Sequence, residues 1–394
     1  MRFLAIFLVF VTLFITKNLP AHARPLSEEE DLPPTHVIAD HVVISEVQVG
    51  GSNSVDHEFI ELYNPTDQPV DMKNWRLTRK TSSGGDENIV TTFPDTAIIP
   101  AFGFFLVVRP ESDIGGIDPD LSYNKSGSII DTAKLANNNT IILYSDQGLT
   151  VVDIVGYGTI TNNTDGYEGS SYPSTPPNGQ SIERKAFYFS KQSDMSGPNS
   201  HASFGNSYDS GNNEDDFITQ TTPNPQNSSS PTERCCTTVQ GDFTLQGRPN
   251  PSGIQVLMWP GSNLRATTTD SDGGFSIPMV PAFAIEGTTA YTVEATFPGY
   301  LSAKANLTLS EHLDVNGQLP ESIGFQALRL LAGDINRDNR VNIFDLSIIG
   351  SQYGSEGVLT GDVNGDSKVN IQDLSLVSGN FGKDSSQYTW VPAP

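Results

Sequence analysis

Short runs of hydrophobic residues, separated by glycine, proline, asparagine and aspartate, recur along most of the chain. Each run has about the length of a β-strand, and turn residues at this spacing are typical of antiparallel sandwiches. In the first half of the chain the runs lie at residues 42–49, 58–63, 104–108, 141–144 and 151–155. They predict a first β-sandwich over residues 40–226, with Trp75 as an anchor of its core.

A second set of similar runs follows in the other half of the chain. These runs lie at residues 238–245, 253–259, 274–277, 291–297 and 301–309. A stretch rich in Pro, Ser and Asn over residues 223–232 precedes them, and this composition is typical of a linker. We therefore place a linker at residues 227–237 and predict a second, smaller β-sandwich over residues 238–331.

The pattern changes near the C-terminus, where hydrophobic residues follow a helical period. Two triplets have the spacing i, i+3, i+7: Leu346, Ile349 and Tyr353, and then Leu374, Val377 and Phe381. Each triplet predicts a short helix, and each follows a polar run of twelve residues. We expect residues 332–383 to form a small helical module, with residues 384–394 as a tail. The predicted fold class is mainly β with a small α-helical module at the C-terminal end.

The N-terminus has the pattern of a secretory signal over residues 1–23. Arg2 precedes an apolar run over residues 3–15, and Ala21-His22-Ala23 fits the small-residue cleavage pattern. The apolar run is shorter than the roughly 20 residues of a membrane-spanning helix. We therefore expect cleavage rather than an uncleaved membrane anchor, followed by a leader over residues 24–39. The mature protein is expected to be secreted, or held at a cell surface only through a partner.

The charge balance limits the partners of the chain. Its 394 residues have room for two or three domains, and they carry a formal net charge of −24 at pH 7. Nucleic-acid-binding proteins usually present a basic patch to the phosphate backbone. The strongly acidic composition therefore argues against nucleic acid as a partner.

The two polar runs have the spacing of EF-hand-like calcium loops, loop 1 over residues 334–345 and loop 2 over residues 362–373. Ca²⁺ takes about 6–8 oxygen ligands, and a twelve-residue loop supplies them from positions 1, 3, 5, 9 and 12 and from the carbonyl of position 7. The predicted ligands are Asp334, Asn336, Asp338, Arg340, Asn342 and Asp345 in loop 1, and Asp362, Asn364, Asp366, Lys368, Asn370 and Asp373 in loop 2. The sequence therefore predicts two Ca²⁺ ions.

Both loops depart from the usual pattern at position 6, where glycine normally makes the sharp turn. Loop 1 has Asn339 there and loop 2 has Ser367. Asparagine tolerates a positive φ better than most residues, so strain is predicted mainly in loop 2. Position 12 is aspartate in both loops, where glutamate is usual.

Both repeats contain Gly-Asp-x-Asn, Val-Asn-Ile and Asp-Leu-Ser. With these motifs residues 332–383 resemble the type I dockerin family, whose members consist of two calcium-loop and helix repeats. The resemblance implies Ca²⁺-dependent folding and docking to a cohesin module of another protein. Cellulosomal dockerins often have Ser and Thr at the partner-reading positions 10 and 11. Here these positions are Ile343-Phe344 and Ile371-Gln372.

The two predicted sandwiches also carry family motifs. Glu58-Phe-Ile-Glu-Leu-Tyr-Asn-Pro65 and Val70-Asp-Met-Lys-Asn-Trp-Arg-Leu77 resemble the lamin-tail domain (LTD), which implies an immunoglobulin-like (Ig-like) sandwich. Gly253-Ile-Gln-Val and Pro298-Gly-Tyr300 resemble the carboxypeptidase-regulatory, prealbumin-like family, which implies a small sandwich without activity of its own.

Other reactive residues form no recognisable catalytic set, and we predict no catalytic residue. Glu58 and Glu61 would lie on opposite faces of one strand because side chains alternate, so they are interpreted, with Glu46, as structural carboxylates. Cys235 and Cys236 are adjacent and form no disulfide framework. A disulfide between these neighbours, a bridge to another chain and two unbonded thiols all remain open.

These features predict a secreted, non-catalytic, modular protein that docks through its calcium module to a cohesin-like partner. The alternative is an accessory component, or an unrecognised hydrolase, in extracellular polysaccharide catabolism, with polysaccharide as a further partner. A module of about 50 residues lacks a large core, so metal binding would supply its folding free energy. Chelation is then expected to unfold residues 332–383 and to leave both sandwiches folded.

Overall fold

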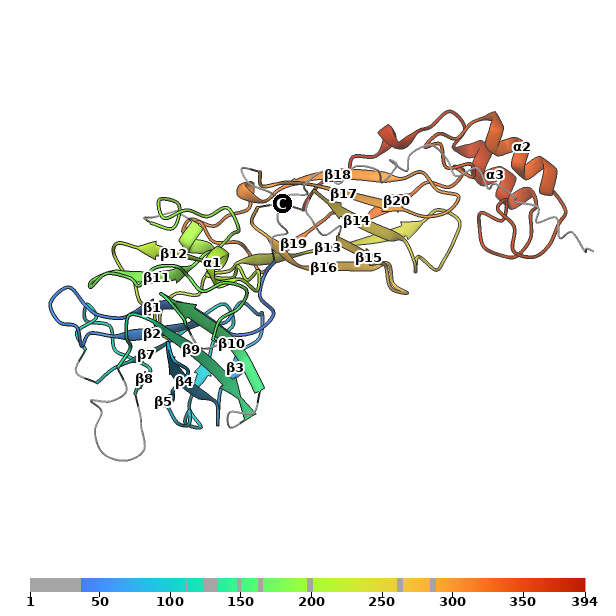
Figure 1. The fold of residues 1–394 in the computed structure, drawn as a ribbon. Coiled ribbons are helices and arrows are strands. Elements are labelled where there is room, and N and C mark those ends of the chain that lie inside the picture. Colours follow the sequence, from blue (N-terminus) through green and yellow to red (C-terminus); the bar gives the residue numbers. More distant parts are fainter. Residues whose placement is uncertain are drawn as a thin grey trace, which may run out of the picture. The chain divides into compact units, whose positions relative to one another are not determined.

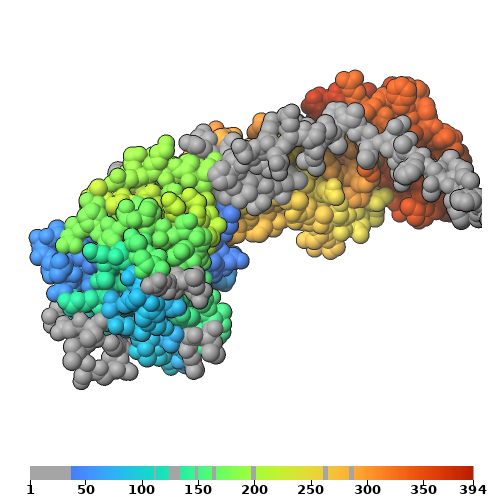
Figure 2. Space-filling view, viewed as in Figure 1, coloured from blue at the N-terminus to red at the C-terminus, as the bar shows by residue number. Residues whose placement is uncertain are grey.

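The structure is a computed structural model. It describes residues 37–110, 112–123, 134–146, 150–161, 166–196, 201–260, 265–283 and 288–393, which are coloured in Figure 2. The expected signal over residues 1–23 lies outside the described residues. No helix among the described residues is long and apolar enough to cross a membrane.

Two antiparallel sheets form the first sandwich (Figure 1). The six-stranded sheet has the order β12-β11-β1-β2-β7-β8, in which only β7 and β8 pair in parallel. Its strands are β1 (Val43–Gln48), β2 (Phe59–Tyr63), β7 (Phe104–Val108), β8 (Leu121–Ser122), β11 (Ser181–Arg184) and β12 (Phe217–Gln220). The four-stranded sheet, in the order β10-β9-β4-β5, contains β4 (Arg76–Thr81), β5 (Asp86–Val90), β9 (Asn139–Ser145) and β10 (Thr150–Tyr157). The short elements are β3 (Val70–Asp71), which pairs with β6 (Ile98–Ile99), the 3-10 helix η3 (His201–Phe204) and α1 (Asn213–Asp216).

The core of the first sandwich lies between these two sheets. Ile60 and Leu62 of β2 belong to the same buried cluster as Leu77 of β4 and Leu143 of β9. Trp75 is only partly buried at the margin of this cluster. The expected anchor, Trp75, is therefore less buried than Leu77, two residues further along the chain.

The six-stranded sheet carries a row of buried carboxyl groups on neighbouring strands. Glu46 of β1 is in register with Glu61 of β2 on one side and with Glu183 of β11 on the other. The carboxylate of Glu61 accepts hydrogen bonds from Oγ of Ser45 at 2.6 Å and from the backbone N of Gln226 at 2.5 Å. Burial raises the pKa of Glu46 to about 8 and that of Glu183 to about 7. These groups therefore hold protons at pH values where exposed glutamates are ionised.

A buried arginine organises the other acidic cluster of the first sandwich. Three carboxylates, those of Glu168, Asp209 and Asp216, converge within 4.8 Å of one another. The fully buried guanidinium of Arg184 lies 3.5 Å from Asp209 and 3.6 Å from Asp216, and it donates to both oxygens of Asp153 at 3.0 and 3.2 Å. Arg184 therefore supplies positive charge to this cluster.

The second sandwich also consists of two sheets (Figure 1). One sheet contains β13 (Cys236–Leu245) between β16 (Gly274–Pro281) and two short parallel partners, β19 (Ser322–Gly324) and β20 (Leu328–Leu330). The other has the order β15-β14-β17-β18 and contains β14 (Gln255–Trp259), β15 (Arg265–Thr268), β17 (Ala290–Thr296) and β18 (Ala303–Thr308). The 3-10 helix η4 (Leu309–Glu311) follows β18.

The two cysteines lie at the start of this second sandwich. Cys235 and Cys236 are both buried as free thiols, with their Sγ atoms 2.9 Å apart. They pack with Phe102 of the first sandwich. Burial of both thiols disfavours the bridge to another chain that the sequence left open.

The C-terminal module contains α2 (Ile343–Gln352), α3 (Ile371–Gly379) and the 3-10 helix η5 (Ser385–Gln387). Its two helices confirm the expected mainly β fold with a small helical module at the end. Ile349 and Val377 are fully buried. Tyr353 and Phe381 are 54% and 53% exposed and lie beyond the helix ends. Each triplet correctly predicts a short helix, but α2 ends at Gln352 and α3 at Gly379, before the third residue of its triplet.

One hydrophobic core is shared by the C-terminal module and the second sandwich. The cluster that holds Ile349 and Val377 also contains Leu301 and Leu330 of the sandwich. Trp390, near the C-terminus, returns to this sandwich, with its ring centroid 4.7 Å from that of Phe325. The two parts therefore stabilise each other by burying apolar surface in common.

Replacing the buried arginine should destabilise the first sandwich strongly. Arg184→Met leaves Asp153, Asp209 and Asp216 without their common cation, and removing one partner of a buried ion pair costs about 3–5 kcal/mol. Lys73→Met is the control, because Lys73 pairs with Asp95 at the surface and exposed pairs contribute less than about 1 kcal/mol. The measurement is the unfolding free energy in urea, with hydrogen exchange of the β1 and β11 amides as a second measurement on the first sandwich. Equal losses in the two variants would contradict the role assigned to Arg184.

The buried glutamates should lower the unfolding free energy of the first sandwich as pH rises. A carboxyl whose pKa is higher in the folded than in the unfolded state stabilises the fold below its unfolded pKa, and this contribution is lost as pH rises through the folded value. With folded values of about 8 for Glu46 and about 7 for Glu183, unfolding free energy should fall between roughly pH 5 and pH 9.

Urea midpoints at three pH values test this expectation. Glu46→Gln keeps a neutral hydrogen-bonding side chain and should reduce the dependence on pH. Glu214→Gln, at an exposed position of α1, serves as the control and should leave the dependence as it is. A pH dependence that Glu46→Gln does not change would contradict the interpretation of the carboxyl row.

Candidate metal centre

The first carboxylate of each loop organises the residues that follow it. Oδ1 of Asp334 accepts a hydrogen bond from the backbone N of Asp338 at 2.9 Å, and its Oδ2 accepts one from the backbone N of Asn339 at 3.0 Å. Asp362 makes the two corresponding bonds in loop 2, at 3.1 and 2.9 Å. Each loop is thus folded around its position 1 side chain.

The last carboxylate closes each loop and begins the helix. Oδ1 of Asp345 accepts from the backbone N of Ile335 at 2.8 Å and of Asn336 at 3.1 Å, and Oδ2 accepts from the backbone N of Asn342 at 2.8 Å. Asn342 in turn is the N-cap of α2, so the pair forms a capping box. Asp373 repeats this arrangement at the start of α3, and both aspartates are fully buried.

Position 6 has the expected sharp turn in both loops. Asn339 has a φ of 61° and Ser367 a φ of 68°. A side chain in this left-handed region costs roughly 1–2 kcal/mol, with asparagine among the more tolerant residues. Both loops therefore hold the turn without glycine, and Ser367 is the residue less suited to it.

The middle positions of each loop converge on the carboxylate of position 5. In loop 1 the side-chain nitrogens of Asn336 and Asn342 lie 2.9 and 3.2 Å from Oδ2 of Asp338. Loop 2 places Asn364 3.1 Å from Oδ2 of Asp366. The remaining predicted residues are at position 7, where Arg340 and Lys368 are exposed, and at position 9 of loop 2, where Asn370 caps α3.

This donor set fits a hard cation. Each loop offers only oxygen ligands, and rotating a side-chain amide by 180° exchanges its nitrogen for its oxygen at the same point. Burial raises the pKa of Asp334 to about 6, and the nearby carboxylate of Asp345 adds to the rise. The carboxylate of Asp334 thus lies in surroundings that disfavour its negative charge. Among the described residues, however, the three carboxylates of neither loop come together within 4.8 Å, because Asp345 and Asp373 face backbone amides.

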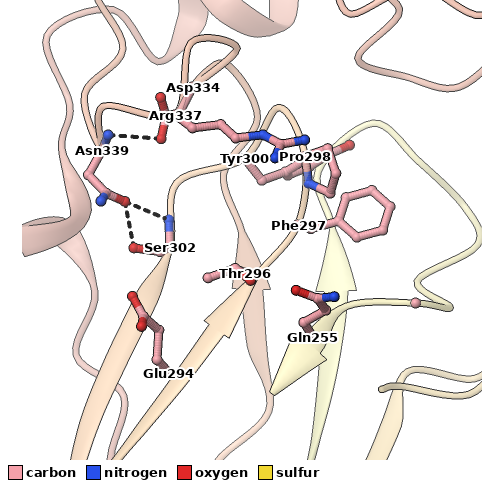
Figure 3. Close-up of a pocket in the computed structure, with 11 residues that line it drawn as sticks. Gln255, Glu294, Thr296, Phe297, Pro298, Tyr300, Ser302, Asp334, Arg337 and Asn339 are labelled. Carbon is pink, nitrogen blue, oxygen red and sulfur yellow. Dashed lines mark hydrogen bonds between the residues drawn. The ribbon is translucent and has the colours of Figure 1, made fainter. Parts of the chain in front are cut away.

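Loop 1 also forms one wall of a cavity of about 600 Å³, shown in Figure 3. The opposite side comes from the second sandwich. The lining residues are Gly253, Gln255, Glu294, Thr296, Phe297, Pro298, Tyr300, Ser302, Asp334, Arg337 and Asn339. We call this space the loop-1 cavity.

Hydrogen bonds tie both loops to the second sandwich. Oδ1 of Asn339 accepts from Oγ of Ser302 at 2.5 Å, and Figure 3 draws this bond together with the one from Asn339 to Asp334. The hydroxyl of Tyr300 lies 3.0 Å from the carbonyl oxygen of Val363 in loop 2. The sequence indicated Asn339 only for its backbone conformation, because a contact so distant in the chain leaves no local signal.

The partner-reading positions present apolar side chains to solvent. Ile343 and Phe344 are 59% and 66% exposed at the start of α2, and Ile371 is 59% exposed at the start of α3. Gln372 next to it is exposed as well. The helix starts thus form two exposed apolar edges on an otherwise acidic chain.

Comparisons with known families identify two parts of the chain. Residues 38–159 match the Lamin Tail Domain, and residues 332–381 match the Dockerin type I domain. These matches confirm the two resemblances found in the sequence, and the second supports the expected cohesin-like partner. The resemblance of residues 238–331 to the carboxypeptidase-regulatory family is not confirmed and stays a prediction. No curated protein matches the chain.

Solved structures show remote similarity. The chain is similar to a type II cohesin–X–dockerin complex of Acetivibrio cellulolyticus, an N-terminal interface mutant, at 24% identity over 39% of this chain and 99% of that one, with a TM-score of 0.31. It is similar to the pilus 2b backbone protein of group B streptococcus at 10% identity, over 74% and 98% of the two chains, with a TM-score of 0.20. The TIE protein of Bacillus anthracis is similar at 8% identity, over 77% and 44%, with a TM-score of 0.20.

Removing calcium should lower hydrogen-exchange protection in the C-terminal module and also in part of the second sandwich. Without a cation the aspartates of each loop repel one another, so hydrogen-exchange protection in α2 and α3 should fall after chelation. The shared core changes the expectation drawn from the sequence, because Leu301 and Leu330 of the second sandwich contact the same cluster. Protection should therefore fall at these two residues as well.

Hydrogen exchange of the full chain with and without EDTA measures both effects. The amides of β1 and β2 in the first sandwich serve as the internal control and should not change. Unchanged protection in α2 and α3 would refute metal-coupled ordering.

Proposed function

We propose that this protein is a secreted, non-catalytic, modular adaptor. Its C-terminal dockerin module binds two calcium ions and docks to a cohesin-like module on a cell surface or in an extracellular complex. The proposed ligands are those predicted from the sequence: Asp334, Asn336, Asp338, Arg340, Asn342, Asp345, Asp362, Asn364, Asp366, Lys368, Asn370 and Asp373.

The observation that carries this proposal is the duplicated loop with the same hydrogen bonds in both copies. Type I dockerin domains bind calcium in general, and residues 332–381 match that family. Two loops, each with a complete set of oxygen donors, support one ion per loop. The bound ion would neutralise the aspartates, while Asp345 and Asp373 couple each loop to the first turn of its helix.

The exposed apolar helix starts support docking through this module. Exposed hydrophobic side chains that lie together mark interaction surfaces, and Ile343, Phe344 and Ile371 are each more than half exposed. Their positions differ from the Ser and Thr of cellulosomal dockerins, which supports a partner with an apolar complementary surface. Both matched families are non-catalytic, and dockerin modules occur in extracellular assemblies, in keeping with the secretory pattern of residues 1–23.

Capture by a cohesin module tests the docking surface. Phe344→Ser removes a large exposed aromatic side chain, and loss of an interface anchor of this kind typically costs about 2 kcal/mol or more. Binding to an immobilised cohesin should therefore weaken by at least about tenfold. Val358→Ser is the matched control, because Val358 is fully exposed between the repeats and lies on neither helix.

A variant of both closing aspartates separates docking from folding. Asp345→Ala combined with Asp373→Ala removes the capping boxes of both helices and should abolish capture together with calcium binding. The single Phe344→Ser variant should still bind calcium in calorimetry. Full capture by the double variant would rule out a calcium-ordered docking module.

A further inference from the structure

The loop-1 cavity has the size and position of a small-molecule site. Its volume of about 600 Å³ lies within the usual range of about 300–1,000 Å³ for ligand pockets. It opens between the outer face of β14 and β17, the turn at residues 297–300, and loop 1. The exposed helix starts proposed for docking do not line this space.

Several polar side chains of the cavity have no partner among the described residues. Gln255 and Thr296 are directly opposite each other on β14 and β17, and neither side chain has a hydrogen bond to another described residue. The same holds for the guanidinium of Arg337, which extends from loop 1 toward Tyr300 and Pro298 (Figure 3). These groups present one amide, one hydroxyl and one cation to the same space.

The other polar side chains of the cavity are engaged. Ser302 and Asn339 hydrogen-bond to each other, and Asp334 accepts from the backbone of loop 1. Oε1 of Glu294 lies 3.3 Å from the ammonium of Lys304, and the Glu294 side chain also lines the cavity. The engaged residues therefore set the shape of the wall, and Glu294 is available as an acceptor for hydroxyl groups.

We propose that the loop-1 cavity binds a saccharide that carries a carboxylate, such as a segment of a polymer of uronic acids. Arg337 would take the carboxylate, since guanidinium binds such groups in a bidentate manner. Gln255, Thr296 and Glu294 supply the mixture of donors and acceptors that sugar hydroxyls require.

Other ligand classes fit the cavity less well. A neutral sugar would leave the charge of Arg337 without a partner. A phosphate-rich ligand would approach the carboxylates of Glu294 and Asp334 with a single arginine to hold it. An extended peptide cannot add as a further strand here, because β14 and β17 are interior strands paired on both sides. The cavity thus matches a polyhydroxylated ligand that places a single carboxylate next to Arg337.

Loop 1 links this site to calcium. Arg337 has a φ of 62° two residues before Asn339, whose side chain bonds to Ser302 across the cavity wall. A cation that orders loop 1 would therefore hold Arg337 in place, and chelation should weaken saccharide binding. This calcium dependence rests on the proposed function, whereas the site itself does not.

Calorimetric titration of the full chain with trigalacturonate tests the proposal. Arg337→Gln should weaken binding at least tenfold, and a neutral trisaccharide should bind at least tenfold more weakly than trigalacturonate to the unaltered chain. Arg329→Gln is the control, because it makes the same charge change at an exposed arginine that does not line the cavity. Gln255→Ala, on the sandwich wall, gives a second variant that leaves loop 1 intact and should also weaken binding.

Several results would overturn the proposal. These are no binding of trigalacturonate, equal binding of the neutral sugar, equal binding of triglutamate, or an affinity that neither Arg337→Gln nor Gln255→Ala changes. Cohesin capture by the same variants is measured in parallel and should be normal. Loss of saccharide binding with normal capture then separates this site from the docking function, and calcium-independent saccharide binding would refute the coupling alone.

Discussion

The buried aspartates that close the two loops impose the main constraint on the C-terminal half of this protein. Asp345 and Asp373 each hold three backbone amides, and both are removed from water. These bonds satisfy the carboxylates as acceptors, as buried polar groups require. Other aspartates occupy the same twelve residues, so a cation in each loop would relieve the repulsion between them, and the all-oxygen surroundings fit a hard cation.

The helices that follow the loops are too short to stand by themselves. The structure gives α2 ten residues and α3 nine, whereas isolated helices below about 12–15 residues are marginal in water. Two supports compensate for this. The capping boxes anchor the first turns, and Ile349 and Val377 complete a core that also contains Leu301 and Leu330 of the second sandwich. Helix formation and sandwich packing are therefore coupled through this shared core.

Local patterns allowed much of this fold to be predicted from the sequence. The spacing of Asp334 to Asp345 is fixed within twelve residues, so the loops and the positive φ at Asn339 followed from residue order alone. Strand β4 was missed because its sequence, Arg-Leu-Thr-Arg-Lys-Thr, is mostly polar. It is paired between β9 and β5, and its Arg79 is held by Glu87 at 2.8 Å and by Asn139 at 3.4 Å. The helical period was extended too far, to Tyr353 and Phe381, because periodicity does not show where a helix ends.

The least predictable feature is the asymmetry between two nearly identical loops. Loop 1 uses the side chain of Asn339 to bond Ser302, and this contact partly offsets the cost of a left-handed asparagine. Ser367 has the same left-handed conformation in loop 2 and tolerates it less well. Among the described residues its side chain makes no hydrogen bond to the sandwich. Loop 2 is held instead through its backbone, where the carbonyl of Val363 meets the hydroxyl of Tyr300. A duplicated sequence has thus produced two loops that meet the second sandwich through different contacts, so the two copies are not interchangeable.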